Sequence, residues 1–275
     1  MALVAVASAK GAPGVSTVAL AMAAVWPRRS LLAECDQSGG DLVYRHKAEN
    51  GRDDLDPRLG MLSLAVAGRT GISPATVWEH AQRAHGGLEV LLGLASPEQC
   101  GAWQGMWPAL GRGLVAIREA DVIADLGRIG PASPGLDLLP MASLVVLVAR
   151  TTTAELAAVR DRALALSERL GRNGGGPPIG VLLIDDKRHH AKVSADVNRY
   201  FLDQQVPAEV FGCLPIDNSG AAQLAGRKSG KVEKSELVRA VKHVVANIHG
   251  RYGVGAEQAP TPVPAPARAE ALGVG

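Results

Sequence analysis

Residues 10–17 have the composition of a phosphate-binding loop. They follow an apolar run, precede a helical pattern, and read Lys10, Gly11, Ala12, Pro13, Gly14, Val15, Ser16 and Thr17. Gly11 and Gly14 would let the backbone turn tightly, so that its N–H groups could approach an anion. A helix that begins near Val15 would direct the positive end of its dipole to the same point. The segment therefore predicts a phosphate site, and an ordinary strand-to-helix turn is the alternative.

Hydroxyl and carboxyl groups could complete a magnesium site beside this loop. The Ser16 hydroxyl could coordinate Mg²⁺, and Thr17 could reach an inner phosphate. Asp36 follows one apolar run and Asp125 ends another, and the carboxyl ends of parallel strands meet at one edge of a sheet. Asp36 could orient a water, whereas Asp125 could hold the ion through water. An Asp36 that only caps a surface turn is the alternative, and Asp121 is expected to be a solvated strand-entry residue.

The elements that must position these residues alternate between strand and helix. Runs rich in Val, Leu and Ile are apolar along their whole length, as expected of parallel strands covered on both faces. These runs are 3–7, 30–34, 122–125, 144–149 and 179–184, with 209–214 as a further candidate. Helical periodicity follows at 16–25, 153–170 and 234–249. Crossover units of this kind predict an α/β layered sandwich. Residues 44–118 show no clear pattern.

Composition limits the class of protein. The net charge of +2 over 275 residues implies neither a polyanion nor a bilayer as a partner of the whole chain, and three scattered cysteines form no C-x-x-C pair. No apolar run reaches the roughly 18 to 20 residues of a membrane span. We expect a cytoplasmic protein with one domain over 1–253. The Pro- and Ala-rich segment 254–275 cannot offset its ordering entropy and is expected to be a disordered tail.

Residues 10–17 resemble the deviant Walker motif of the ParA/MinD family, K-G-G-x-G-K-[ST]-[ST]. Residues 34–40 are similar to the D-x-D-x-x-G segment of that family, and residues 213–217 to its x-I-P-x-D loop. The resemblance covers about residues 2–250 and includes pilus-assembly and septum-site relatives. It implies a P-loop NTPase-like three-layer sandwich with a mostly parallel sheet, with ATP and Mg²⁺ as cofactors.

The resemblance also implies roles for single residues. Lys10 would reach across a nucleotide-sandwich homodimer to the phosphates of the partner, and Asp36 would hold the attacking water or the metal shell. Pro215 and Asp217 would line the base. Where the family often has an Asn that reads the base, this chain has Asp185, Asp186 and Lys187, and a carboxylate there would fit the donors of guanine better than adenine. ATP remains the expectation through family likeness alone.

Val15 departs from the family pattern, because it replaces the lysine that spreads the charge of the β- and γ-phosphates. A valine neither donates a hydrogen bond nor neutralises charge. Losing one preorganised donor in comparable sites costs on the order of 3 kcal/mol in the activation free energy, or about a hundredfold in rate. The family motif is therefore degenerate here, and we expect hydrolysis to suffer more than binding.

Two functions fit these residues. The first is an ATP-binding dimeric spatial organiser with weak ATPase activity, in partitioning or in placement of a secretion or pilus machine through an unidentified protein partner. The second is a non-hydrolysing pseudo-ATPase that serves as a scaffold or localisation factor. Val15 favours the second, whereas Lys10, Ser16, Asp36 and Asp125 favour the first. An iron–sulfur reductase of a related type would need paired cysteines.

Basic segments at 187–192 and 227–231 could bind nonspecific DNA, as family members do, although a solvated loop is the more common meaning of such a run. The proline-rich end of the chain would break an amphipathic membrane helix, so no direct membrane insertion is expected. Trp103 and Trp107 are four residues apart and are expected to pack in the core rather than form a partner surface.

Overall fold

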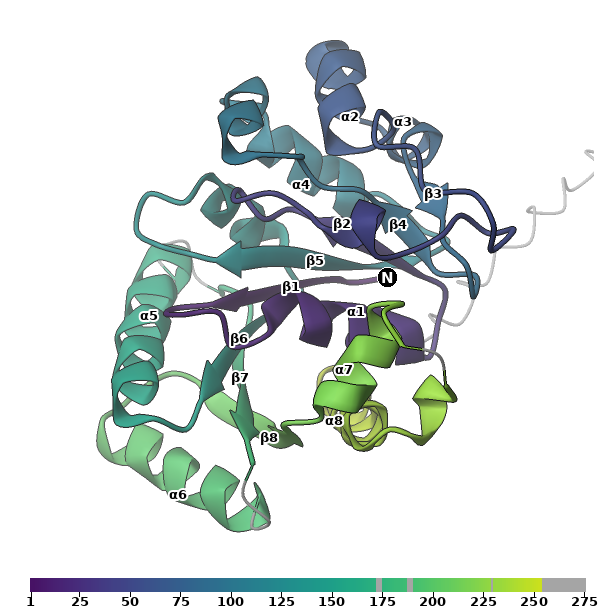
Figure 1. Ribbon diagram of the computed structural model, residues 1–275. Helices are drawn as coiled ribbons and strands as arrows, with labels where there is room; N and C mark the ends of the chain where they lie inside the picture. The colour runs from purple at the N-terminus through teal and green to yellow at the C-terminus, as the bar shows by residue number, and fades with distance from the viewer. Residues whose placement is uncertain (172–174, 187–189, 229, 254–275) are drawn as a thin grey trace, which may run out of the picture.

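Eight strands form one sheet in the order β3-β4-β2-β5-β1-β6-β7-β8 in the computed structural model, which describes residues 1–171, 175–186, 190–228 and 230–253 (Figure 1). All neighbouring strands are parallel except β3 and β4. The bounds are β1 Leu3–Ser8, β2 Ser30–Glu34, β3 Gln82–Arg83, β4 Glu89–Leu91, β5 Asp121–Arg128, β6 Leu144–Arg150, β7 Ile179–Asp185 and β8 Glu209–Pro215. The central strands β5 and β1 therefore end at the same edge.

Helices cover both faces of this sheet. One face is covered by α1 Val15–Val25, α7 Asn218–Leu224 and α8 Glu236–Tyr252, with the short helix η5 Val232–Lys234 beside them. The other face carries α2 Met61–Ala67, α3 Pro74–Glu79, α4 Trp107–Val115, α5 Thr153–Gly171 and α6 His190–Asp203. The remaining short helices are η1 Leu42–Tyr44, η2 Gly68–Thr70, η3 Pro97–Trp103 and η4 Pro134–Met141.

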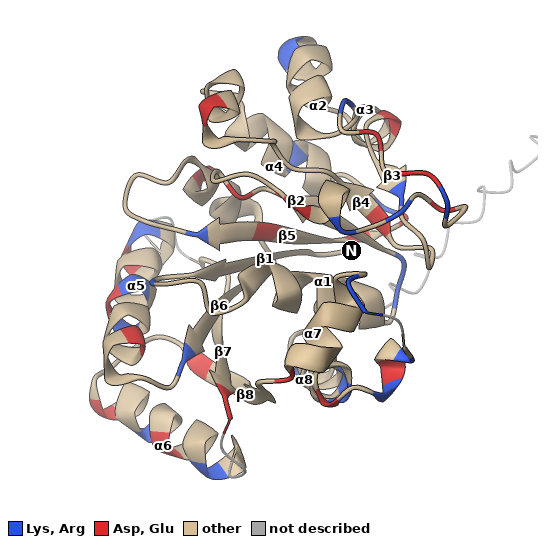
Figure 2. Cartoon of the chain, in the orientation of Figure 1, with Lys and Arg blue, Asp and Glu red and all other residues tan. Residues whose placement is uncertain are grey.

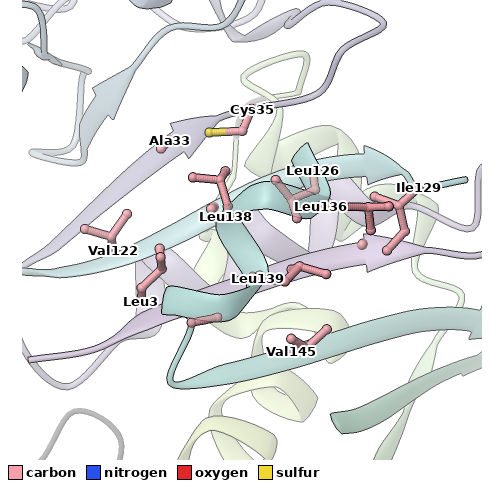
Figure 3. Close-up of a cluster of buried hydrophobic side chains, with 14 of the residues drawn as sticks. Leu3, Ala33, Cys35, Val122, Leu126, Ile129, Leu136, Leu138, Leu139 and Val145 are labelled. Atoms are coloured by element: carbon pink, nitrogen blue, oxygen red, sulfur yellow. The ribbon is translucent and has the colours of Figure 1, made fainter. Parts of the chain in front are cut away.

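Two separate apolar clusters hold the layers together. Even-numbered residues of β1, such as Val4 and Val6, face α1 and α8, whereas odd-numbered residues, such as Leu3 and Ala5, face the other layer. Figure 3 shows part of the cluster on the face away from α1, where Leu136, Leu138 and Leu139 of η4 pack on β1 and β5. Because β-strand side chains alternate, a strand that is apolar along its whole length feeds both clusters at once. The predicted three-layer α/β sandwich with a mostly parallel sheet is confirmed.

The segment that showed no pattern, 44–118, holds a small helical layer and the sheet edge. Its elements are short, and β3 has 2 residues. Trp103 and Trp107 belong to η3 and α4 rather than to one helix, but both are buried and their ring centroids lie 5.8 Å apart. The expectation that they pack in the core is confirmed. The predicted tail, 254–275, lies outside the described residues.

Asp121 corrects an expectation, because it is not solvated. Its exposed fraction is 0%, and it begins β5. Its carboxylate accepts hydrogen bonds from the backbone N–H of Ala2 at 2.7 Å and from Nε1 of Trp26 at 2.9 Å, and Arg28 lies 3.3 Å away. These partners offset the cost of burying the charge. Asp121 thereby ties the start of β1 and the end of α1 to β5.

Candidate functional site

The loop from β1 to α1 has the backbone of an anion site. Gly11 and Gly14 have φ values of 68° and 107°, in the left-handed region that favours glycine. Gly14 precedes α1 as its N-cap, and the first turn of α1 has neither a side-chain cap nor an acidic residue. The first N–H groups of a helix have no intrahelical partner, so those of α1 remain for a ligand. The loop therefore combines left-handed glycines with an uncapped helix start, which are two features that a phosphate site would use.

The side chains of the loop divide into exposed and buried ones. Lys10, Gly11 and Ala12 are exposed, Ser16 and Thr17 are partly buried, and Pro13 is buried. Val15 is 6% exposed and packs in the α1-face cluster. The position that carries an ammonium in the family motif therefore faces apolar neighbours here. At the end of β1, Ser8 Oγ is buried and has no hydrogen-bond partner among the described residues.

Asp125 lies beside the loop, as the sequence predicts. It is 3% exposed, on the face of β5 that is covered by α1. Burial raises the pKa of Asp125 to about 6, while hydrogen bonds from the Ser16 hydroxyl and the Gly127 N–H oppose this rise and the charge of Asp36 adds to it. The predicted trio of Ser16, Asp36 and Asp125 is therefore brought together at one edge of the sheet.

Asp36 packs directly on the end of β5. Its Oδ1 accepts a hydrogen bond from the Ser38 N–H at 2.8 Å, and a Cβ at Gly127 would lie 1.8 Å from its Oδ2. Burial raises the pKa of Asp36, while the Ser38 hydrogen bonds and the charge of Arg128 oppose this rise. Asp36 is thus held between β5 and its own turn. Asp36 does cap its own turn through Oδ1, as the alternative interpretation expects, but its Oδ2 faces Gly127 of β5.

Glu34 and Arg128 also lie at this edge of the sheet, although their sequence positions assigned a role to neither of them. Glu34 accepts hydrogen bonds from the N–H groups of Asp41, Leu42 and Gly93 at 3.0, 3.1 and 2.9 Å. Burial raises its pKa to about 7. Glu34 therefore joins the turn after β2 to the chain after β4. Arg128 ends β5 at the same edge, and local spacing gives no signal for it, because regular alternation would place it on the face opposite to Asp125.

The residues expected around the base mostly bind other parts of the protein. Asp217 caps α7, where its Oδ1 accepts from the Gly220 N–H at 2.7 Å, and its Oδ2 accepts from the Leu237 N–H at 3.3 Å. Asp185 is 4% exposed, and its Oδ2 accepts from the Thr151 hydroxyl at 2.5 Å. Pro215 pairs with Asp185 at the end of the sheet and is partly buried.

A cavity of about 840 Å³ lies away from this site, near the end of α1 and the start of β2. Its lining is rich in cations: Arg28, Arg29, Arg45, Lys47 and Arg83. Each has a carboxylate within ion-pair distance, respectively Asp121, Glu89, Asp41, Asp54 and Glu49. The cavity therefore has little uncompensated positive charge to hold an anion.

The donors at the loop fit a magnesium nucleotide. Free helix N–H groups suit phosphate oxygens, and a hydroxyl with nearby carboxylates suits Mg²⁺. No group of three His, Cys, Asp or Glu side chains in the described part of the chain could hold a metal ion by itself. Phosphate oxygens and waters would complete the coordination of the ion. Of the two basic segments, residues 187–189 and 229 lie outside the described residues, and Lys228 donates to Ser219 Oγ.

None of the described helices is both long and apolar enough to cross a bilayer. No protein-family model and no curated protein matches the sequence.

Solved structures share the architecture. A ParA family ATPase from Chlorobium tepidum has a TM-score of 0.67 at 14% identity, and the match covers 89% of this chain and 98% of that one. The septum site-determining protein MinD from Pyrococcus horikoshii, in complex with Mg-ADP, gives 0.64 at 14% identity and covers 94% and 99%. A putative plasmid partition protein from Borrelia burgdorferi, bound to AMPPNP, gives 0.63 at 12% identity and covers 90% and 98%.

These likenesses define the class of fold as that of the P-loop nucleotide-binding proteins. Within that class, the chain has the fold of the ParA/MinD ATPases. At identities of 12 to 14%, the comparison shows the fold alone.

Proposed function

We propose that this chain is a ParA/MinD-type protein that binds ATP with Mg²⁺ at the loop 10–17 and hydrolyses it slowly. The observation that carries the proposal is the convergence of Ser16, Asp36 and Asp125 on a loop with left-handed glycines and an uncapped helix. Two structural neighbours were solved with Mg-ADP and with AMPPNP, which supports the choice of ligand. Asp36 would orient the attacking water, and Ser16 and Asp125 would hold the ion.

The proposed cellular role is that of a dimeric spatial organiser in partitioning or in placement of a secretion or pilus machine. Lys10 is exposed on the protomer, as a residue that reaches the phosphates of a second copy would have to be. The neighbours include a ParA family ATPase and a putative plasmid partition protein, which supports partitioning as a role for this fold. An unidentified protein partner, and nonspecific DNA through the basic segments, complete the proposal.

The second candidate is a pseudo-ATPase scaffold, which the burial of Val15 favours. A buried isopropyl group leaves the terminal phosphates without the preorganised ammonium on which transfer depends. A pseudo-ATPase of this kind binds nucleotide but does not hydrolyse it. The two candidates therefore differ in one measurable quantity, the rate of phosphate release.

Nucleotide binding and turnover test both candidates. We expect saturating MgATP to raise the melting temperature and to give calorimetric heat, and the wild type to release phosphate about a hundredfold more slowly than the Val15→Lys variant. The added lysine can lay its apolar stem in the valine site and extend its ammonium outward, and circular dichroism checks that the variant folds.

Asp36→Ala is the control, because it removes the water-orienting carboxylate and should abolish any turnover. Phosphate release by the Val15→Lys variant with none by the wild type would favour the scaffold. No heat and no thermal shift with either MgATP or MgGTP would reject nucleotide binding altogether.

A further inference from the structure

The end of β5 contains one residue more than its neighbour β1. Val6 pairs with Asp125, but Ser8 pairs with Arg128, so two residues of β1 match three of β5. Gly127 has a φ of 57°, the left-handed conformation typical of such a bulge. The N–H of Ile129 then donates to the carbonyl of Ser8 at 2.9 Å, which anchors the strand end beside the start of the loop.

The bulge decides which face Arg128 takes. Leu126 and Ile129 both belong to the cluster on the face away from α1, and Figure 3 shows both beside Leu136. Without the extra residue, Leu126 and Arg128 would share that face, because strand side chains alternate. With it, Arg128 takes the same face as its partner Ser8 and as Asp125. This is the face that α1 covers, and the loop 10–17 leads from β1 to α1.

The strand order places Arg128 between two parts of the candidate site. β5 lies between β2, which leads to Asp36, and β1, which leads to the loop (Figure 1). Figure 2 shows acidic colour within β5 and basic colour at its end. The Arg128 side chain is exposed, and its charge acts on Asp36. Among the described residues, no ion pair includes Arg128.

We propose that Arg128 provides, at the nucleotide phosphates, the positive charge that Val15 cannot provide. This inference rests on the proposed function. A guanidinium is always charged and its forked donors match phosphate oxygens, so it can replace an ammonium that approaches from a different element. Arg150 at the end of β6 is less suited, because the Glu155 carboxylate, which accepts a hydrogen bond from the backbone N–H of Arg150 at 2.8 Å, places a negative charge beside that strand end.

Calorimetric titration of Arg128→Gln with MgATP, MgADP and AMP tests this role. We expect the Kd for MgATP to rise about tenfold or more, the Kd for MgADP to rise less, and the Kd for AMP to stay unchanged, because the lost charge acts on the outer phosphates. The dependence of MgATP binding on salt concentration should also weaken. Arg128→Lys should keep most of the affinity.

Arg118→Gln is the matched control, since it removes the same charge from an exposed residue just before β5 at the opposite edge of the sheet. It should bind MgATP like the wild type. Adding Val15→Lys to Arg128→Gln should restore affinity by returning an ammonium to the loop. Melting temperatures without nucleotide show that each variant is folded.

Two failures are distinguishable. If the wild type binds MgATP and Arg128→Gln binds it equally well, this inference is wrong and the proposed function stands. A larger loss of affinity in Arg150→Gln than in Arg128→Gln would also overturn it. If the wild type binds no nucleotide, the proposed function itself is wrong.

Discussion

Gly127 is the residue on which the geometry of the site depends most directly. It combines a φ of 57° with an Asp36 oxygen 1.8 Å from where a Cβ would be. Gly127→Ala should therefore lower the free energy of unfolding by about 1–3 kcal/mol and weaken MgATP binding, because Asp36 must move. Urea denaturation and calorimetry measure the two effects.

Gly130→Ala is the control for that substitution. Gly130 has no positive φ, and a Cβ there would meet only Ser133 Oγ at 3.9 Å, which is ordinary contact. It should unfold like the wild type. A Gly127→Ala protein that is as stable as Gly130→Ala would show that the bulge tolerates a side chain.

Glu34 should make the stability of the protein depend on pH. Burial raises its pKa to about 7 in the folded state, from 4.5. Because the folded state holds the proton of Glu34 more tightly than the unfolded state, the contribution of this group to stability is fully present below pH 4.5. This contribution is lost as the pH rises through 7, because the buried group must then ionise. From these pKa values the loss is at most about 3 kcal/mol.

Glu34→Gln should remove this dependence, because the amide does not titrate. We expect the unfolding free energy of the wild type to fall relative to that of Glu34→Gln between pH 4.5 and pH 7.5. Denaturation without Mg²⁺ at several pH values measures the difference, with Glu79→Gln on the surface of α3 as the control. A constant difference across that range would contradict the assignment.

Residues of the candidate site differ in how far the sequence could predict them. The loop glycines, Ser16 and Asp125 follow from local spacing, because each lies where a strand ends or a helix begins. Glu34 could not be understood locally, since its partner Gly93 is 59 residues away along the chain. Arg128 was missed because alternation alone directs it to the wrong face, and only the extra residue at Gly127 reverses this.

At the scale of elements, the central strands were predictable and the sheet edge was not. Strands such as β1 and β6 are covered on both faces and so are apolar up to their last residue. β3 and β4 have 2 and 3 residues. β4 depends on pairing with β2, and β3 on pairing with β4, which no local pattern reveals. Short 3₁₀ segments such as η3 and η4 likewise have too few turns to produce a periodicity.

The junction of α7 and α8 provides a prediction at this scale. Asp217 accepts N–H groups from the starts of both helices, so Asp217→Ala should lower the unfolding free energy by about 1–2 kcal/mol. Asp217→Asn should retain the cap on α7 and most of the stability. Chemical denaturation of both variants tests this.

The same variants test whether Asp217 also lines the base. If it does, both substitutions change the affinity for MgATP relative to MgGTP, and if it only caps helices, neither does. Stability equal to the wild type in Asp217→Ala would contradict the capping role.

For the whole molecule, composition and patterning were enough to predict the layered sandwich. The same strands contribute alternate side chains to both apolar clusters, so each strand is apolar along its length. The helical layer at 61–115 was less predictable. Its packing relies on Trp103 and Trp107, whose indole N–H groups are buried without a partner among the described residues. The packing of these two indoles depends on the strands of the sheet that they cover, and not on the sequence of the segment alone.

The bulge at Gly127 has a consequence for comparing this chain with other sequences. In a relative whose strand lacks the extra residue, an arginine three positions beyond the acid would point into the apolar layer and would have to be replaced. A glycine followed by arginine, two and three positions after that acid, is therefore a recognisable signature. If Arg128 acts at the phosphates, this pair, together with an apolar residue in place of the loop lysine, marks chains in which the neutralising charge comes from the end of the neighbouring strand.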